Sequence, residues 1–585
     1  MKTSFNRLRF FVIGALLLVA AQRPSLAGSA TWNQNPTNGD WNTATNWTPQ
    51  TVPNSTTDIA TFDASNVTDV SISFGSVINL DSAVFNSGAP AYTITLDVSN
   101  LILNGTGFVN NSGSVQSVFI PEQDNLVGGL FLFNSATAGN MVSYSSVGGF
   151  FDFEDFSSAG SAAFDVSSGS LQAIMAFQNS STAGDAVINA STLTDIEFFD
   201  STTGGNATLN LSSAASVSFP GSANAEHMTV NCIGGNQSLG SAVFLEGHST
   251  AAEGTFSAVG ATTIGEHGGY IELGNEATAD HATFIIGGAL GARLDSGILV
   301  FLQTATAANA SITANGGVNG SLGGLVVFAD KSKGGKASIT LNGNSELDIS
   351  DRTTGVTIGS LAGEGTVYLG ANPLTIGSNN QSTTFSGVIQ ESGGLTKSGT
   401  GTLTLSGANT YTGLTTVTGG VLNAGNQTGS ATGLSAVNVN SGTLGGSGII
   451  AGATTIGAGS GGGAFLTLAV GTNKQATLTI QSALTFNSDA TYTYTFKAKS
   501  NKAKTDKVIA NGVTINGASV NLTGQTQGNL KRGLRLTLIS NTSTNPISGT
   551  FSNMPDGGII TINGNKFQAS YQGGDGNDLI LTVVP

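Results

Sequence analysis

An internal repeat of 21 to 28 residues dominates the sequence between residues 130 and 341. Each repeat contains two apolar residues separated by one position, and the period of a β-strand places both of those side chains on one face. We call the second apolar residue of each pair the anchor of its repeat. The nine anchors are Leu132, Phe153, Phe177, Phe198, Phe219, Leu245, Leu273, Phe301 and Phe328.

A second short strand follows each anchor at a constant distance. Positions 9, 11 and 13 after the anchor are mostly small or apolar and alternate with polar Thr, Ser and Asn; in the first repeat they are Met141, Ser143 and Ser145. All variation in repeat length falls after this second strand. A constant connection predicts a defined corner, whereas a variable one predicts outward loops. The longest loops follow Cys232, Ala258, Ile286 and Ala314.

One repeat cannot bury its own apolar face, so successive coils must stack about 4.8 Å apart and bury it jointly. This predicts an all-β fold, a parallel β-helix or β-solenoid, and right-handed because nearly all crossovers between parallel strands are. A β-propeller would need about 40–45 residues per blade, roughly twice the observed repeat. We expect an N-terminal cap and first coils in residues 28–125, coils of the repeat in 126–341, and a C-terminal β-rich region in 461–585.

The N-terminus predicts export. Lys2, Arg7 and Arg9 precede an apolar run at residues 10–21, and Ser25-Leu26-Ala27 supplies small residues at a cleavage site. An apolar run this short disfavours the alternative of a retained membrane anchor, because a spanning helix needs about 20 residues. We therefore expect residues 1–27 to be a signal peptide, and we expect no transmembrane anchor after its removal.

Charge and cysteine content exclude several classes of protein. The formal net charge is -15, and residues 1–27 contain four basic and no acidic side chains, so the exported part is more acidic still. This net charge argues against a nucleic-acid partner, which requires a cationic surface. The single cysteine, Cys232, cannot form an intrachain disulfide and lies at an inward position, where we expect a buried apolar residue.

Residues 393–425 read GGLTKSGTGTLTLSGANTYTGLTTVTGGVLNAG. With its Leu-Thr-Lys start, its Leu403-Thr404-Leu405 strand and its turn at residues 409–413, this segment closely resembles the autotransporter-associated β-strand repeat. Residues 356–390 look like the coils that commonly precede such a repeat. We accordingly assign residues 342–460 to this repeat region.

The tail is similar to the ends of autotransporter passengers, notably in ISGTFSNMPDG at residues 547–557 and YQGGDGNDLILTV at residues 571–583. The resemblance implies a right-handed parallel β-helix that is displayed or secreted by a Gram-negative-type bacterium. Autotransporters also carry a C-terminal outer-membrane barrel. We expect this chain to lack one, which makes it passenger-like and leaves the cell surface, the medium and the periplasm open as locations.

Three residue groups are candidate functional sites. Trp32, Trp41 and Trp47 predict either a cap over the first coil or a platform for stacking on sugars. Five lysines between positions 497 and 507 predict a solvated connection or a contact with an anionic glycan or lipid headgroup. Asp575 and Asp578 belong to a lone GGxGxDxUx motif and are a weak calcium candidate.

His227, His248, His267 and His281 raise the question of a metal site. His227 and His281 share one repeat position but lie two coils apart, about 9.6 Å along the axis, too far for one zinc ion. We therefore expect a solvated polar ladder. Acidic residues gather in two places, but neither pattern contains a recurring strand-aligned trio of carboxylates with a basic partner. These residues are Asp152, Glu154 and Asp155, and Glu246, Glu253, Glu266, Glu272 and Glu276.

The sequence predicts a structural or adhesive protein that presents extended faces and outward loops to cell-surface glycans or proteins. We assign no catalytic residue and no cofactor, and leave the oligomeric state open. The alternative is a polysaccharide lyase or glycoside hydrolase on the same scaffold, because such enzymes also use parallel β-helices and need two carboxylates about 5–9.5 Å apart.

Overall fold

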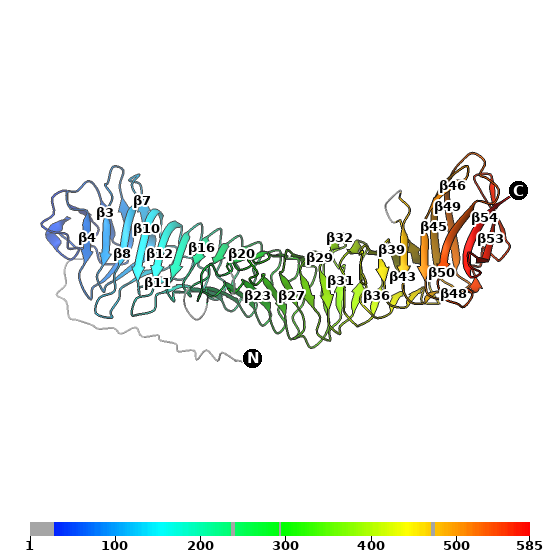
Figure 1. Cartoon of the computed structure of the whole chain (residues 1–585). Helices are drawn as coiled ribbons and strands as arrows, with labels where there is room; N and C mark the ends of the chain where they lie inside the picture. Colours follow the sequence, from blue (N-terminus) through cyan, green and yellow to red (C-terminus); the bar gives the residue numbers. More distant parts are fainter. Residues whose placement is uncertain (1–27, 236–239, 292–293, 470–473) are drawn as a thin grey trace.

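The computed structural model describes residues 28–235, 240–291, 294–469 and 474–585. They form a long, bent rod of stacked β-coils (Figure 1). Apart from one short 3-10 turn, η1 (Ala44–Asn46), every regular element in these ranges is a strand. The predicted all-β parallel solenoid is therefore confirmed, with additional antiparallel strands at both ends.

The anchors lie on the first of four ladders, the anchor ladder, in which each strand pairs in parallel with the next. Its strands are β1 (Ala30–Trp32), β3 (Ile59–Phe62), β5 (Val77–Phe85), β7 (Asn100–Asn110), β9 (Gly129–Leu132), β11 (Phe150–Phe153), β13 (Ile174–Phe177), β15 (Asp195–Phe198), β17 (Ser216–Phe219), β19 (Ala242–Leu245), β21 (Tyr270–Leu273), β23 (Ile298–Phe301), β25 (Leu325–Phe328), β27 (Glu346–Asp348), β30 (Thr366–Tyr368) and β33 (Val388–Gln390).

The predicted second strands form the second ladder, which extends almost to the C-terminal end. Its parallel strands are β4 (Asp69–Ile72), β6 (Thr93–Leu96), β8 (Gln116–Ile120), β10 (Asn140–Val147), β12 (Ser161–Ser167), β14 (Val187–Ser191), β16 (Thr208–Leu211), β18 (Thr229–Cys232), β20 (Thr255–Ala258), β22 (Thr283–Ile286), β24 (Ser311–Ala314), β26 (Ser338–Leu341), β29 (Ser360–Gly363), β32 (Thr383–Phe385), β35 (Thr402–Leu405), β37 (Val421–Ala424), β39 (Gly442–Gly446), β42 (Ala464–Thr467), β45 (Ala490–Lys499) and β49 (Ser519–Gln527).

Two further ladders begin in the C-terminal half. The third contains β28 (Val356–Ile358), β31 (Leu374–Ile376), β34 (Leu395–Lys397), β36 (Thr415–Val417), β38 (Val437–Val439), β41 (Thr454–Ile456), β44 (Leu484–Phe486), β48 (Val513–Asn516) and β51 (Ser548–Thr550). The fourth contains β40 (Ile449–Ile450), β43 (Thr477–Ile480), β47 (Lys507–Ala510) and β50 (Arg535–Asn541), followed by antiparallel β54 (Asp578–Val584), β53 (Asn565–Gly573) and β52 (Ile559–Ile562).

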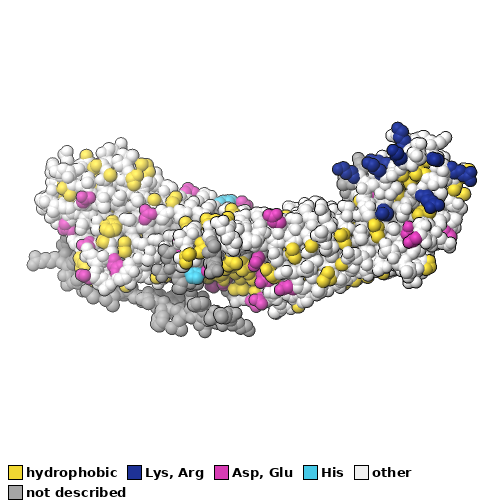
Figure 2. Space-filling model, viewed as in Figure 1, with side chains coloured by type: hydrophobic (Ala, Val, Ile, Leu, Met, Phe, Trp, Pro, Cys, Tyr) yellow, Lys and Arg dark blue, Asp and Glu magenta, His cyan; other side chains and the backbone are white. Residues whose placement is uncertain are grey.

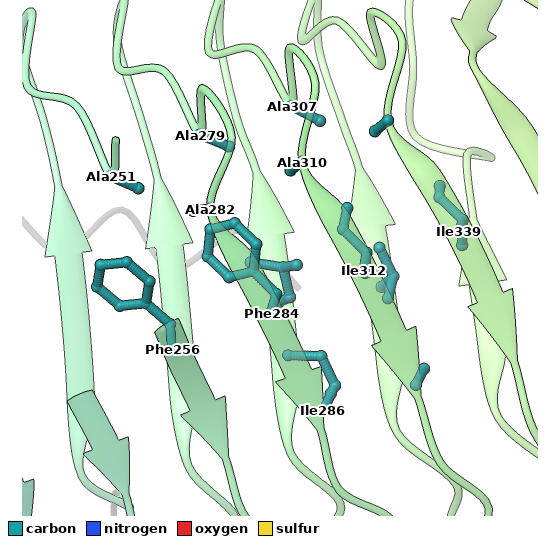
Figure 3. Packing of buried hydrophobic residues seen from close by; sticks show 14 of the residues in the cluster. Ala251, Phe256, Ala279, Ala282, Phe284, Ile286, Ala307, Ala310, Ile312 and Ile339 are labelled. Atoms are coloured by element: carbon teal, nitrogen blue, oxygen red, sulfur yellow. The ribbon is translucent and has the colours of Figure 1, made fainter. Parts of the chain in front are cut away.

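The register is the one that the repeat predicts. Anchor rings stack directly, with centroids 4.5 Å apart for Phe177 and Phe198 and 4.8 Å apart for Phe198 and Phe219. On the second ladder, Phe256 and Phe284 point into the same interior, beneath alanines at the corner (Figure 3). Repetition of one side chain along the axis thus lets each coil bury the apolar face of the next.

The first repeat departs from the expected register. Met141 is exposed, and Val142 and Tyr144 point inward in place of the predicted Ser143 and Ser145. The pairing of β10 with β12 shifts between Asn140 and Ser143, and Met141 has a φ of 53°. This bulge inserts one residue and reverses the parity of the strand, so the inward assignment of Ser143 and Ser145 was wrong.

The corner between anchor and second strand has constant length because two of its positions adopt left-handed backbone. The position two after each anchor has φ between 52° and 81°, and the position seven after has φ between 45° and 90°. The first set is Asn134, Asp155, Asn179, Asp200, Gly221, Gly247, Asn275, Gln303 and Asp330. The second set is Gly139, Gly160, Gly184, Gly205, Glu226, Ala252, Asp280, Ala308 and Gly335.

Between these two positions runs a polar column, five residues after each anchor, that bridges successive coils by isolated parallel pairing. Its members are Thr137, Ser158, Thr182, Thr203, Asn224, Thr250, Thr278, Thr306 and Lys333. An asparagine ladder runs along the second strands: Asn210 donates to Asn189 and Asn231 donates to Asn210, each at 2.9 Å. Polar columns therefore repeat along the axis in the same way as the apolar ones.

Both ends of the stack are covered. At the N-terminus Trp32, Trp41 and Trp47 are buried, and Trp47 lies 5.0 Å from Trp32 and 4.9 Å from Trp41 between ring centroids. The cap prediction is confirmed, and the alternative of a sugar-stacking platform is wrong because the rings are covered. At the C-terminus, antiparallel β52, β53 and β54 close the fourth ladder, which shields an edge that would otherwise pair with other chains.

The close stacking of corners predicts that Gly205→Ala destabilises the solenoid. A Cβ atom at Gly205 would lie 2.4 Å from the carbonyl oxygen of Gly184 in the preceding coil, and its φ is 59°. We expect a loss of roughly 1–3 kcal/mol in the free energy of unfolding, measured in urea.

Gly221→Ala is the matched control. Gly221 also has a positive φ, 81°, but a Cβ atom there would meet nothing closer than 3.7 Å. We expect a loss of about 1 kcal/mol, from the left-handed backbone alone. Equal losses in the two variants would show that contact between coils does not constrain the corner.

Candidate functional site: the outward loops

The four long connections on one side of the rod pack against one another. We call their described residues, 233–235, 259–269, 287–291, 294–297 and 315–324, the loop ridge. The backbone of Gly235 and His267 exchanges two hydrogen bonds of 3.2 and 3.1 Å. Ala261 N donates to Asp295 O at 2.8 Å, and Ala289 N donates to Leu322 O at 2.9 Å. Successive coils thus hold their loops together as a continuous surface.

The ridge has an apolar cluster separate from the core of the rod. It consists of Ala261, Ala289 and Leu294, all buried. The Ser321 hydroxyl donates to the carbonyl of Ala289 at 2.9 Å. The turn at Glu266 is similarly ordered, because its carboxylate accepts from Thr262 and Thr263, and these hydrogen bonds lower the pKa of Glu266 to about 2. The ridge is therefore a built structure and not a loose set of loops.

Large apolar side chains project from this ordered ridge into solvent. Ile264 is 92% exposed, Leu322 56% and Leu290 54%. Hydrophobic side chains are also gathered near the middle of the rod in Figure 2. Since exposed apolar surface on an ordered scaffold often marks a contact site, the ridge is the strongest candidate for partner binding on the described part of the chain.

Each of the four histidines contacts one carboxylate. The distances are 3.5 Å for His227 and Glu253, 3.2 Å for His248 and Glu276, 2.7 Å for His267 and Asp295, and 2.8 Å for His281 and Asp280. Within the described ranges no three His, Cys, Asp or Glu residues converge as ion ligands. The histidines thus lie in exposed pairs with single carboxylates, and one of these pairs, His267 and Asp295, lies in the loop ridge.

The acidic group near β11 is also tied to the ladders. Asp152 accepts a hydrogen bond of 2.8 Å from Gln178 on the next coil, just after β13. Burial raises the pKa of Asp152, with the Gln178 hydrogen bond opposing it, and burial followed by repulsion from Asp152 and Asp155 raises the pKa of Glu154. The carboxylates of Asp152 and Glu154 are therefore partly desolvated, and that of Asp152 is hydrogen-bonded to the side-chain amide of Gln178.

The calcium candidates lie in a hairpin. Asp575 and Asp578 fall in and after the turn between antiparallel β53 and β54, where Gly573 pairs with Asp578. Asp578 accepts from the backbone N–H of Asn541 at 2.9 Å, and burial raises its pKa. Calcium sites of this motif form between successive parallel copies. Calcium binding at Asp575 and Asp578 stays a prediction.

Cys232 is buried on β18, as expected, and burial raises the pKa of its thiol to about 12. A thiol with so high a pKa is a poor nucleophile at neutral pH. The side chain therefore contributes packing to the interior.

Residues 393–425, which resemble the autotransporter-associated repeat, contain buried polar side chains whose hydrogen-bonding partners the sequence pattern did not reveal. Lys397, the lysine of the Leu-Thr-Lys start, points into the rod in register with Ile376 and Val417. Its ammonium group donates to the carbonyl of Ser398 at 2.5 Å and to those of Gly399 and Gly419 at 3.2 Å each. All three of its donors are satisfied, which permits a cation at an inward position.

Asn409, the asparagine of the motif's turn, joins three successive coils. Its side-chain oxygen accepts from the N–H of Ile389 at 2.8 Å, and its amide donates to the carbonyl of Ala431 at 2.6 Å. Tyr411 is buried beside it, with its hydroxyl 2.6 Å from that of Thr415. The recognisable residues of the repeat thus satisfy buried polar groups where the anchor ladder has ended.

Comparison with known proteins agrees with this geometry. Residues 395–424 match the family model "Passenger-associated-transport-repeat". A stretch of 98 residues is 37% identical to the adhesin BmaC autotransporter of Brucella suis biovar 1 (strain 1330) and covers 17% of this chain and 3% of the relative. The chain thus spans only a small part of that relative's length.

A solved structure, that of the Haemophilus influenzae Hap adhesin, aligns over 90% of this chain and 64% of the other, with 11% identity and a TM-score of 0.24. Together, the matched repeat and the solenoid make this chain an autotransporter-passenger-like protein. No helix in the described ranges is long and apolar enough to cross a membrane.

The position of Lys397 predicts a pH dependence of stability. Burial lowers its pKa to about 8, whereas a lysine in the unfolded chain titrates near about 10.4. Between these values the unfolded chain binds more protons, so stability rises with pH. We expect the free energy of unfolding in urea to gain on the order of 1–3 kcal/mol from this group between pH 7 and pH 10.

Lys397→Met is the control, because it retains length and removes the charge. Subtracting the curve of this variant from the wild-type curve isolates the contribution of the lysine from other groups that titrate in the range. A difference that stays constant from pH 7 to pH 10 would contradict the assigned pKa.

Proposed function

We propose that this protein is an exported, non-catalytic adhesive passenger that presents the loop ridge to cell-surface glycans or proteins. The observation that carries the proposal is the ridge itself: ordered loops with their own apolar cluster hold Ile264, Leu290 and Leu322 in solvent. Similarity to an autotransporter adhesin over 98 residues supports the same function. Exposed apolar side chains on a preorganised support lose little entropy when a partner covers them.

We propose further that the protein works at the cell surface or outside the cell, with the periplasm as the remaining location. The predicted signal peptide, residues 1–27, lies outside the described residues. Its amino-acid pattern and the passenger-like solenoid both support export. Cell fractionation combined with N-terminal sequencing tests this, with Gly28 expected as the first residue of the mature chain.

The adhesive function is tested with beads coated with purified mature chain and applied to whole bacterial and animal cells. Changing Ile264, Leu290 and Leu322 together to Ser should reduce bead attachment about tenfold, because central apolar contacts dominate most interfaces. The midpoint of thermal unfolding should not change, since these side chains are largely exposed. Protease or periodate treatment of the cells distinguishes a protein from a glycan receptor.

The control changes three exposed apolar residues elsewhere on the rod, Val115, Leu126 and Phe156, to Ser. This variant should attach as the unchanged protein does. If both sets of substitutions reduced attachment equally, general hydrophobicity would explain binding and the ridge would have no special part in it.

The second candidate function is polysaccharide cleavage, and the desolvated Asp152 and Glu154 are the observation in its favour. We expect no new reducing ends or unsaturated products when the mature chain is incubated with a panel of acidic polysaccharides. Turnover that disappears in Glu154→Gln would replace the adhesive proposal with an enzymatic one.

A further inference from the structure

A hairpin near the C-terminus places lysines directly opposite lysines. The second half of β45 pairs antiparallel with β46 (Lys502–Thr505), with Lys497 opposite Lys504 and Lys499 opposite Lys502. We call these four residues the lysine hairpin. Like charges directly opposite one another destabilise a pair of strands. A bound anion would remove this repulsion.

The surroundings of the hairpin add positive charge. Lys507 and Arg535 line the same open hollow, together with the polar side chains of Gln525, Gln527 and Asn501. No carboxylate lines the hollow in the described part of the chain. The four ion pairs within 4 Å found in the described ranges all involve histidines, so none of them contains a lysine of the hairpin. Asp578 interacts electrostatically with Lys507, which lies outside the hairpin.

The nearest acidic residue in sequence is already engaged. Asp506 is buried, and its carboxylate accepts from the N–H of Ala476 at 2.9 Å and from the N–H and hydroxyl of Thr495 at 3.0 and 2.8 Å. It supports the base of the hairpin. Its negative charge is directed into the fold and away from the exposed ammonium groups.

Charge is segregated along the whole rod. Residues 28–460 contain 6 Lys or Arg against 30 Asp or Glu, whereas residues 461–585 contain 10 against 5. Figure 2 shows the basic side chains gathered at the C-terminal end, with the acidic ones scattered along the rest. A cationic end on an otherwise anionic rod concentrates anions at that end alone.

We propose that the lysine hairpin binds an anionic polysaccharide through its carboxylate, sulfate or phosphate groups. The lysines stem from backbone positions about 7 Å apart along each strand and about 5 Å across the pair, a regular arrangement that suits a polymer with regularly spaced charges. The amides of Gln525, Gln527 and Asn501 can bind sugar hydroxyls. Because no exposed large apolar residue of the described chain lines the hollow, the surface is unlike one that inserts into a bilayer.

This site lies on a different part of the rod from the loop ridge and does not depend on it. Apolar loops that contact one partner and a cationic end that holds a polysaccharide would give the rod two independent points of attachment. Loss of binding at one of these sites can therefore be measured while the other site still binds.

The test uses the mature chain with dextran sulfate as the probe and uncharged dextran of equal length as its control. We expect saturable binding of dextran sulfate that weakens as salt rises, and no binding of dextran. Changing Lys497, Lys499, Lys502 and Lys504 together to Gln should weaken binding at least about tenfold at low salt. The same substitutions should leave the thermal unfolding midpoint equal or higher, because they remove repulsion between strands.

A matched variant changes Lys331, Lys333 and Lys336 to Gln, which removes a second group of lysines from the acidic part of the rod. It should bind dextran sulfate as the unchanged chain does. Equal binding by the hairpin variant, or an equal loss in both variants, would overturn the proposal.

Two further measurements test whether the lysine hairpin binds another class of partner instead of a polysaccharide. If salt-dependent self-association in sedimentation vanished in the hairpin variant while dextran sulfate binding remained, the hairpin would be a site for the acidic face of a second copy. If a short DNA duplex displaced dextran sulfate at lower concentration than an acidic polysaccharide such as polygalacturonate, the partner would be a nucleic acid. Either result would replace the polysaccharide assignment.

Discussion

The in-register stacking of coils is the constraint on which the rest of this molecule depends. A single coil exposes an apolar face that it cannot cover, and only the coils above and below it remove that face from water. Anchor rings such as Phe177 and Phe198 therefore lie face to face, and backbone hydrogen bonds join each strand to the same strand of the next coil. Every departure from the repeat must be accommodated without interrupting this stack.

Because of that requirement, each coil has one connection of constant length, the corner, and one of variable length, the outward loop. The corner after the anchor repeats its two left-handed residues from coil to coil, and neighbouring corners lie so close that a Cβ atom added at Gly205 would be 2.4 Å from the carbonyl oxygen of Gly184. The connection after the second strand varies in length from coil to coil, and its added residues pack against the neighbouring loops. Insertions there extend outward without disturbing the ladders, which is why the loop ridge, and with it the proposed adhesive surface, arises on that side.

Contacts between coils also determine where polar groups can be buried inside the stack. Lys397 and Asn409 occupy buried positions only because carbonyl and N–H groups of their own and adjacent coils satisfy them. At the C-terminal end two ladders gain antiparallel strands: β54, β53 and β52 close the fourth ladder, and β46 pairs with the second half of β45 on the second ladder to form the lysine hairpin. The cationic surface thus comes from an antiparallel addition to one strand of the second ladder, which itself continues in parallel to β49.

The amino-acid sequence by itself determined the fold class, the anchors, the second strands and the outward position of the loops, because strand period and repeat length are local properties. It also indicated the passenger-like repeat and the tryptophan cap. It missed the bulge at Met141, since a single inserted residue changes parity without changing composition. Only the tertiary structure decided that separate loops join into one ridge, that Lys397 points inward, and that Lys497 opposes Lys504. Each of these depends on which residues of different coils or strands become neighbours, and that contact is set by the register of the stack.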